Sequence, residues 1–590
     1  MLYQLALASL VSGALAVPAT VSNPRYDYIV VGGGTSGLVV ANRLSEDPTV
    51  SVAIIEAGDS VMNNTNVTDI MGYSKAFGTA IDWAYESTPQ KYAGGKAQVM
   101  RAAKAIGGTS TINGMTYLRA ETAQIDAWEK LGNHGWNWTT LLEYYKKSEY
   151  FQTPSAAQRV AGASGDPRVH GFTGPLTVGW AETMMNGSIV HEINSTYQAL
   201  GLDYNPEPNN GTLRGINIFP KTLDNEQNVR EDAGRAYYYP VSKRPNLDIY
   251  LNAFAERMTW EAESHTEKPF ANGVTFTTGG QQKTILANRE IILSAGALRS
   301  PLILEQSGVG NPAILKKAGV PVKVANRFVG ENLQDQTTSD MAFGSKSNYT
   351  GNAGFAGYFT AAQLFGNNSA AIEASVVNNI NSYAARVANA TGNVIDVNVT
   401  ASLFKIQSDL IFQNHLPVSE ILVTPTSTGT FSIEYWGLLP FSRGNIHITS
   451  SNASAGAAID PNYFMLEYDT AQQVYSSKMA RTLANTAPLS NNINGESEPG
   501  LDVVGENASD ADWAKWVKSA YRSNFHYIST AAMMSEELGG VVDDSLLVYG
   551  TDNVRVVDAS VIPMQVCGHL TSTLYAVAEK AADAIKGRYA

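Results

Sequence analysis

Three glycines near the N-terminus have the spacing of a dinucleotide-binding loop. Gly32, Gly34 and Gly37 form a G-x-G-x-x-G motif within the stretch YDYIVVGGGTSGLVV, with Thr35 and Ser36 between them. Glycines at these positions let the backbone turn sharply and approach a pyrophosphate, which then lies at the positive end of the following helix. The spacing therefore predicts a site for a dinucleotide.

The flanking residues supply the elements that such a loop needs. The apolar run 28–31 predicts a buried strand, residues 38–44 continue as a helix, and residues 51–55 predict a second buried strand that ends at Glu56. Glu56 follows Gly34 by 22 residues, about where an acidic side chain binds the ribose hydroxyls. Because an acidic residue there disfavours a 2′-phosphate, the motif indicates FAD or NAD and not NADP.

The C-terminal end of the chain resembles a further piece of the same domain. Residues 553–560 form an apolar strand that carries Asp558, and a helix is predicted over residues 572–585. No second glycine motif follows a strand elsewhere, so there is no separate site from which NAD(P)H could reduce a flavin. A cofactor domain completed by the last fifty residues or so is discontinuous, with a substrate domain inserted into it. Within that insertion, residues 420–424 and 429–435 predict strands.

Length and composition set the class of protein. The chain has 590 residues, of which 44% are hydrophobic and 16% charged, so it is a globular protein with at least two domains. Its formal net charge of −13 would repel nucleic acid and anionic membranes, and we expect neither as a partner. The sequence leaves the oligomeric state open between monomer and homodimer.

The N-terminus predicts an exported protein. Residues 1–16 read as a signal peptide, with an apolar stretch before the small-x-small pattern at residues 14–16 but no positive n-region. No later window has the roughly 18 apolar residues of a membrane helix. Glycosylation sequons support secretion into the extracellular medium from a eukaryotic cell, and they lie at Asn63, Asn66, Asn137, Asn186, Asn194, Asn210, Asn348, Asn367, Asn389, Asn398, Asn452 and Asn507.

Several classes of site are excluded by missing patterns. There is no H-x-H or H-E-x-x-H and only one cysteine, so we expect no metal site. No G-x-S-x-G elbow is present, which argues against a hydrolase. The lone Cys567 allows no intrachain disulfide, and we expect it to pack near the cofactor without a catalytic role.

Four ordered motifs carry a resemblance to a known family. Residues 104–120 (KAIGGTSTINGMTYLRA), 296–310 (GALRSPLILEQSGVG), 330–336 (GENLQDQ) and 553–563 (NVRVVDASVIP) are similar to the signatures of the glucose–methanol–choline (GMC) oxidoreductases. The resemblance implies FAD as the cofactor and an α/β (α+β) fold. A discontinuous Rossmann-like FAD-binding domain would comprise residues 24–60, 96–120, 225–340 and 545–590. A substrate domain, built on an antiparallel sheet flanked by helices, would comprise residues 61–95, 121–224 and 341–544.

Within this family the chain looks most like fungal FAD-dependent glucose dehydrogenases. This resemblance implies oxidation of the C1 hydroxyl of β-D-glucose to glucono-1,5-lactone, with electrons passed to a quinone or another acceptor that is not dioxygen. Fungal glucose oxidases are near neighbours, and an oxidase or another sugar or alcohol oxidoreductase of the family remains the alternative. The preference for a dehydrogenase rests on residues 566–568, before His569. A third hypothesis is that the protein is a hydroxynitrile lyase of the same fold.

The resemblance also assigns roles to individual residues. His526 and His569 correspond to the family's active-site pair, with His526 as the main base that removes the hydroxyl proton; the two roles could be exchanged. Arg522, Asn524 and Glu434 would bind the sugar. Cofactor contacts are expected from Gly32, Gly34, Thr35, Ser36, Gly37, Glu56, Gly108, Thr109, Asn113, Gly114, Met115, Ala255, Asp558, Ala559, His569 and Thr571.

One stretch departs from the family pattern. After the first histidine the family commonly has Pro-Val-Gly-Thr, whereas this chain has Tyr527, Ile528, Ser529 and Thr530. Loss of a proline and a glycine changes the backbone preference beside the base. We expect an effect on pocket shape and not on the base itself.

Overall fold

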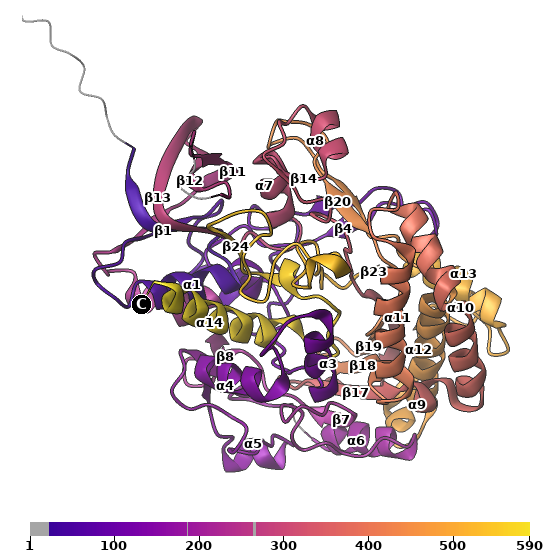
Figure 1. Ribbon diagram of the computed structural model, residues 1–590. Coiled ribbons are helices and arrows are strands. Elements are labelled where there is room, and N and C mark those ends of the chain that lie inside the picture. The colour runs from indigo at the N-terminus through magenta and orange to yellow at the C-terminus, as the bar shows by residue number, and fades with distance from the viewer. Residues whose placement is uncertain (1–22, 186, 264–266, 590) are drawn as a thin grey trace, which may run out of the picture.

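The chain folds around two seven-stranded sheets (Figure 1). The computed structural model describes residues 23–185, 187–263 and 267–589. The predicted signal peptide, residues 1–16, lies outside the described residues. In the part of the chain that the structure describes, no helix is long and apolar enough to cross a membrane.

The first sheet combines a parallel core with an antiparallel hairpin. Its order is β10-β2-β1-β13-β12-β11, with β24 paired to β13 beside β12. The parallel strands are β1 (Arg25–Val31), β2 (Val52–Ile55), β10 (Leu247–Tyr250), β13 (Gln281–Leu293) and β24 (Val554–Val556). The hairpin strands are β11 (Ala253–Trp260) and β12 (Ala271–Thr278).

The predicted strand, loop, helix and strand are all present at the N-terminus. β1 and β2 are almost continuously apolar and buried, as expected for strands covered on both faces. Helix α1 (Thr35–Leu44) begins directly after the glycine loop, and its buried side packs against helix α14 (Leu570–Arg588). The first and last parts of the chain therefore lie side by side (Figure 1).

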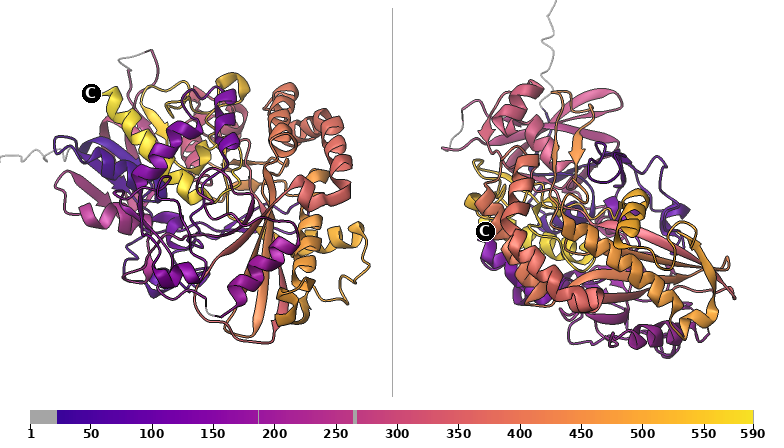
Figure 2. Two further views of the ribbon diagram at one scale, coloured as in Figure 1. Left: turned by 90° about the horizontal axis from the view of Figure 1, so that it is seen from below. Right: turned by 90° about the vertical axis from the view of Figure 1, so that its right-hand side faces the viewer.

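The second sheet is antiparallel and lies in the inserted part of the chain. Its order is β22-β16-β19-β18-β17-β7, and β23 also pairs with β16. The strands are β7 (Gly215–Ile218), β16 (Thr337–Ser345), β17 (Phe355–Thr360), β18 (Pro417–Pro425), β19 (Thr430–Gly437), β22 (Ile493–Glu498) and β23 (Arg522–Ser523). β18 and β19 confirm the two strands predicted there. Helix α12 (Glu467–Asn485) packs on β16, β18 and β19, and the helices α10 (Ser369–Ala390) and α11 (Val397–Phe412) pack against each other on the same side (Figure 2).

Shorter helices connect these layers. They are α2 (Thr65–Thr68), α3 (Thr122–Asp126), α4 (Trp138–Ser148), α5 (Ala156–Val160), α6 (Ile189–Ala199), α7 (Ser300–Gln306), α8 (Pro312–Ala318), α9 (Ala361–Phe365) and α13 (Asp510–Ala520). Two-residue or three-residue strands form the remaining sheets: β3 (Tyr85–Glu86) with β4 (Val99–Met100), β5 (Glu149–Phe151) with β6 (Leu176–Val178), β8 (Leu223–Asp224) with β9 (Val229–Arg230), β14 (Val309–Gly310) with β15 (Val324–Ala325), and β20 (Asn445–His447) with β21 (Ala458–Asp460).

The two sheets follow the predicted division of the chain. Every strand of the first sheet falls within the segments assigned to the cofactor domain, and the second sheet is built from the intervening segments. β16 is the exception, because it crosses the predicted boundary at residue 340. The precise domain limits stay a prediction.

Candidate functional site

One large cavity receives side chains from both sheets. It has a volume of about 490 Å³ and contains most of the residues that the motifs singled out. The predicted residues that line it are Gly32, Gly34, Thr35, Ser36, Glu56, Gly108, Thr109, Asn113, Gly114, Met115, Ala255, Glu434, Asn524, His526, Asp558, Ala559, His569 and Thr571. Gly37 and Arg522 are the two predicted residues that do not line it.

The glycine loop forms a narrow cradle at one end of this cavity. Gly32 has φ +108°, and a Cβ added there would lie 2.4 Å from the carbonyl oxygen of Ser294. Gly108 has φ +53°, and its added Cβ would lie 2.5 Å from Cα of Gly34. Gly37 lies beneath the loop, where a Cβ would approach the Gly32 carbonyl oxygen to 2.0 Å. Only glycine fits these close approaches, so the backbone itself lines the cavity.

Glu56 closes the cradle from the end of β2. Its carboxylate accepts hydrogen bonds from the amides of Gly33 (2.8 Å) and Gly58 (2.7 Å), and burial raises its pKa to about 7. The hydroxyls of Ser36 and Ser294, which also line the cavity, are buried without a hydrogen-bond partner in the described structure. Buried polar atoms without partners, together with the cradle, fit a dinucleotide with phosphate and ribose oxygens.

The segment predicted to run beneath the flavin ring is tied to the C-terminal helix. The Asn113 side chain donates to the hydroxyl of Thr571 (3.1 Å), and the buried Arg230 donates to the carbonyl and side-chain oxygens of Asn113. Met115 adopts φ +64°, a left-handed conformation that is uncommon for a residue with a side chain. These contacts fix the wall of the cavity beside the two histidines.

Asp558 joins three segments at the edge of the first sheet. Its carboxylate accepts hydrogen bonds from the amide of Gly296 (2.8 Å), the hydroxyl of Ser300 (2.5 Å) and the amide of Ser560 (2.8 Å). Burial raises the pKa of Asp558. Asp558 therefore holds these three segments together, while its contact with the cofactor stays a prediction.

His526 is held so that one ring nitrogen remains free. Its Nδ1 lies 2.7 Å from Oε1 of Gln336, whose own amide group donates to the carbonyl of Leu438 (2.9 Å). Nδ1 is contacted by Gln336 and by the Asn524 side chain, whereas Nε2 has no hydrogen-bond partner among the described residues. In the tautomer that donates Nδ1–H to Gln336, Nε2 is the nitrogen that can accept a proton. Burial, with His569 and Arg522 adding to it, lowers the pKa of His526 to about 3. The ring is therefore neutral at physiological pH and able to accept a proton.

His569 faces His526 across the cavity. The two ring centroids lie 5.6 Å apart, with an interplanar angle of 78°. Nε2 of His569 lies 3.0 Å from Oε1 of Glu420, a fully buried carboxylate on β18. This hydrogen bond fixes the orientation of the His569 ring.

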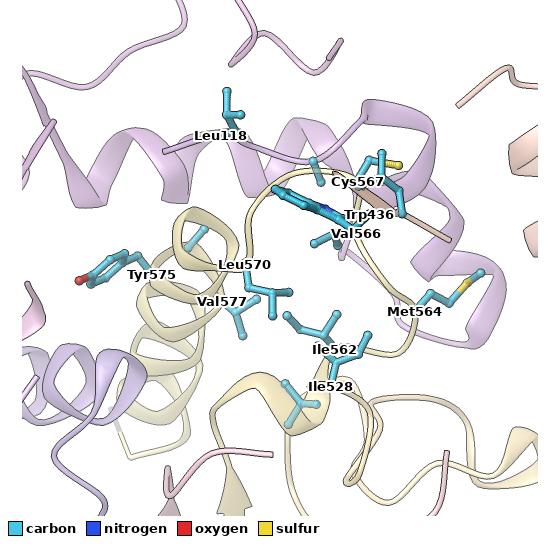
Figure 3. Packing of buried hydrophobic residues seen from close by; sticks show 14 of the residues in the cluster. Leu118, Trp436, Ile528, Ile562, Met564, Val566, Cys567, Leu570, Tyr575 and Val577 are labelled. Atoms are coloured by element: carbon cyan, nitrogen blue, oxygen red, sulfur yellow. The ribbon is translucent and has the colours of Figure 1, made fainter. Parts of the chain in front are cut away.

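Aromatic and aliphatic side chains surround the pair. The Trp436 ring stands edge-on to both histidines, at 6.4 Å from His526 and 5.7 Å from His569. The segment 562–570 carries His569 into the start of α14. Five of its side chains pack into the hydrophobic core, namely Ile562, Met564, Val566, Cys567 and Leu570 (Figure 3). Cys567 is part of this packing and does not line the cavity, as expected for a non-catalytic residue.

The predicted sugar-binding residues lie beside the histidines in two arrangements. Asn524 lines the cavity and its side chain lies 3.1 Å from Nδ1 of His526. Arg522 is ion-paired with Glu434 and lies 3.7 Å from a carboxylate oxygen of Asp340. Glu434 reaches the cavity wall and Arg522 does not, so Arg522 positions Glu434 in this structure. A direct contact of Arg522 with a substrate stays a prediction.

The departure after the first histidine is accommodated by the backbone. Ser529 stands where the family pattern has glycine, and it adopts φ +73°. Its hydroxyl accepts a hydrogen bond from Gln334 (2.9 Å) and donates to the carbonyl of Ile562 (2.5 Å), which holds this left-handed conformation. Tyr527 lines the cavity and is bonded through its hydroxyl to the Arg101 carbonyl (3.3 Å).

Several residues of the site were missed by the sequence-based reasoning. Glu420 and Gln336 contact the two histidines directly, and Trp436 packs against both. Trp436 could have been found, because it lies two residues after Glu434 and directly after the predicted strand 429–435, so an extended backbone would point both side chains to the same face. Gln336 ends the motif 330–336 and Glu420 begins a predicted strand, but neither pattern indicates a contact with a histidine that is more than 140 residues away in sequence.

Family models match both ends of the chain. A model described as GMC oxidoreductase matches residues 26–338, and a second one with the same description matches residues 440–578. The chain belongs to the GMC oxidoreductase family. Among relatives of this GMC oxidoreductase, the glucose oxidase-like protein fsoC of Humicola fuscoatra is 46% identical over 95% of both chains. Glucose oxidase of Aspergillus carbonarius is 34% identical over 98% of this chain and 94% of its own.

Solved structures support the same assignment. An FAD-dependent oxidoreductase from Chaetomium thermophilum superposes with a TM-score of 0.87 at 27% identity, over 96% of this chain and 99% of its own. A fungal aryl-alcohol oxidase gives a TM-score of 0.83 at 26% identity, over the same shares of the two chains. The GMC oxidoreductase described here is therefore an FAD enzyme that acts on CH–OH groups.

Proposed function

We propose that this protein oxidises a pyranose sugar at its C1 hydroxyl, the reaction that converts β-D-glucose to glucono-1,5-lactone. The observation that carries the proposal is the neutral His526, whose Nε2 is free beside His569 in a cavity that fits FAD. Asn524 and Glu434 on the same wall offer the donor and acceptor groups that a sugar hydroxyl needs. Relatives named glucose oxidase point to the same substrate class.

The residues divide the reaction between them. Nε2 of His526 accepts the proton of the substrate hydroxyl, because an alkoxide donates hydride far more readily than an alcohol. His569, oriented by Glu420, binds the same oxygen and stabilises its developing negative charge. Trp436 covers the site and excludes water. FAD, when bound, supplies the two-electron acceptor for the hydrogen on carbon.

For the final electron acceptor we propose dioxygen, on the strength of the relatives named glucose oxidase. The preference for a quinone-type acceptor rested on residues 566–568. These residues are buried and none of them lines the cavity, so the structure offers that preference no support. A quinone-type acceptor remains the other outcome of the test.

The test is anaerobic mixing of the purified holoenzyme with sugars, followed by exposure to air or to a quinone. We expect the yellow absorbance of the flavin to bleach with D-glucose and to return in air with formation of hydrogen peroxide. D-xylose, maltose and benzyl alcohol serve as comparison substrates. A flavin that stays oxidised with every sugar would refute the sugar assignment, and reoxidation by quinone alone would make the protein a dehydrogenase.

We also propose that the protein is secreted and N-glycosylated. Among the sequon asparagines that the structure describes, eight are exposed, namely Asn63, Asn210, Asn348, Asn367, Asn389, Asn398, Asn452 and Asn507, whereas Asn186 lies outside the described residues. Asn137 is half-buried and caps α4 through its side chain, so we expect it to be a poor acceptor. A fall in mass on endoglycosidase treatment of protein recovered from culture medium is the expected result.

A further inference from the structure

One cation in the cavity has no part in the reaction described above. Three Lys or Arg side chains line the cavity: Arg101, Lys221 and Arg299. Arg101 is ion-paired with Asp82, and Arg299 lies over Phe254, whose neighbour Ala255 also lines the nucleotide end. Lys221 is left without a carboxylate partner among the described residues.

Backbone hydrogen bonds on both sides of Lys221 hold this residue in the wall of the cavity. The Lys221 amide donates to the carbonyl of Gly179 (2.7 Å), and its carbonyl accepts from the amide of the same residue (2.9 Å). The next residue, Thr222, donates its amide to the carbonyl of Met115 (2.8 Å). Two residues earlier, Phe219 lines the cavity and its ring lies 6.5 Å from that of His569. Lys221 is therefore anchored on both sides, and it lines the same cavity as His526 and His569.

The ammonium group has unused hydrogen-bonding capacity. Nζ donates to Oδ1 of Asn352 (2.6 Å), and the Asn352 amide group in turn donates to the carbonyl of Ile70 (3.1 Å). An ammonium has three N–H groups, so two remain after this contact. Arg230 is the charged group that acts on Lys221, and it is a cation as well.

An unpaired charge in this position is unfavourable without a ligand. Burial, together with Arg230, lowers the pKa of Lys221 to about 8, so the ammonium is still charged at neutral pH. Apolar side chains, including Met115, Met185 and Phe219, line the cavity together with it. A bound anion would compensate the charge and use the free N–H groups.

We propose that Lys221, with Asn352, binds a carboxylate of the substrate, so that the preferred substrates are hydroxy acids such as hexuronic acids. The assignment of a sugar acid rests on the proposed function, whereas the carboxylate subsite itself does not. A charge-assisted hydrogen bond in a sheltered site changes affinity by about ten- to a hundredfold.

The first test measures binding without turnover. Benzoate and its neutral isostere benzamide are titrated into the holoenzyme at pH 6.5, with the flavin spectrum as the readout. We expect benzoate to bind at least about tenfold more tightly than benzamide, and K221Q to abolish this preference. K221R should retain it, and K316Q, which removes an exposed lysine on α8, should leave it unchanged. Equal binding of the two probes by the unaltered protein, or full preference in a folded, FAD-loaded K221Q, would overturn the inference.

The second test addresses the substrate. The rates of flavin reduction by D-glucuronate and D-glucose are compared in the unaltered protein, K221Q and K316Q. We expect D-glucuronate to react faster in the unaltered protein and in K316Q, and to lose that advantage in K221Q. If no sugar reduces the flavin, the proposed function fails while the benzoate experiment still decides on the carboxylate subsite. A benzoate preference that survives K221Q, with only the flavin spectrum altered, would place the ammonium against the cofactor instead.

Discussion

Nε2 of His569 lies 3.0 Å from Oε1 of Glu420, while the second oxygen of that carboxylate, Oε2, is buried without a hydrogen-bond partner in the described structure. The pair lies at the meeting point of two distant parts of the chain, β18 and the segment before α14. Because Nε2 contacts Glu420, we expect Nδ1 to be the ring nitrogen of His569 that meets the substrate oxygen. Glu420 therefore acts on the reaction through His569 and is a positioning residue.

Glu420→Gln tests this relationship. The amide keeps a hydrogen-bond acceptor near His569 but removes the negative charge that orients the ring. We expect flavin reduction to slow by about ten- to a hundredfold, with FAD content unchanged. The matched control is Glu498→Gln, a charge removal on an exposed residue of β22. A variant that reacts at the normal rate would show that the carboxylate has no influence on the reaction through His569.

The pH profile tests the state of His526. Because its pKa is lowered to about 3, the neutral form that accepts a proton is present at every pH above that value. As the pH is lowered through 6.5, the ordinary pKa of histidine, protonation of His526 should therefore not reduce the second-order rate constant of flavin reduction. His526→Ala should slow the reaction by about a hundred- to ten-thousandfold while FAD stays bound. A loss of less than about tenfold would assign the role of base to His569.

Gly32→Ala tests the cradle. The new Cβ would lie 2.4 Å from the Ser294 carbonyl oxygen in a backbone conformation that alanine rarely adopts. We expect purified G32A to contain little or no FAD, measured as the ratio of flavin to protein absorbance. Gly456→Ala is the control, because nothing lies within 4 Å of a Cβ added there. Normal FAD content in G32A would contradict the close approach of backbone and cofactor.

The ion pairs of His447 with Glu305 and Glu331 predict a pH-dependent contribution to the free energy of unfolding. Its Nδ1 lies 2.8 Å from Glu305 and its Nε2 3.1 Å from Glu331, and these carboxylates raise its pKa to about 9 against the opposing effect of burial. A raised folded-state pKa gives stability that is fully present below about pH 6.5 and is lost as the pH rises through 9. We expect H447Q to lose about 3 kcal/mol of unfolding free energy at pH 6.

A second measurement of the unfolding free energies of H447Q and the unaltered protein, at pH 9.5, tests the direction of the pH dependence. The gap between H447Q and the unaltered protein should narrow there, because His447 is largely neutral in both the folded and the unfolded chain. His134→Gln, at an exposed position, is the control and should be near neutral at both pH values. A gap that stays constant with pH would indicate a packing defect and not a lost ion pair.

Sequence reasoning performed best where local patterns determine structure. The glycine loop, the two strands around it and the C-terminal helix were predicted from spacing and apolar runs alone, and all are present. Helix α10, in contrast, was not predicted from the sequence. Only five of the 22 residues of α10 are buried, so few apolar positions mark its packed face.

The candidate site shows the same division. His526 and His569 were found because each stands in a recognisable stretch of sequence. Glu420 could not be found that way, since it lies 149 residues from His569 and is brought there only by the pairing of the second sheet. Lys221 was missed for a related reason, because nothing in its local sequence marks it as lining a cavity.

The first sheet takes β1 from the start of the chain and β24 from its end, and His569 lies beyond β24. During synthesis β1 and the glycine loop emerge from the ribosome long before β24 has been made. The dinucleotide site is therefore incomplete until the end of translation. A chain that ends before residue 554 would lack both β24 and His569. We therefore expect a chain that ends before residue 554 to retain little FAD and to have no activity.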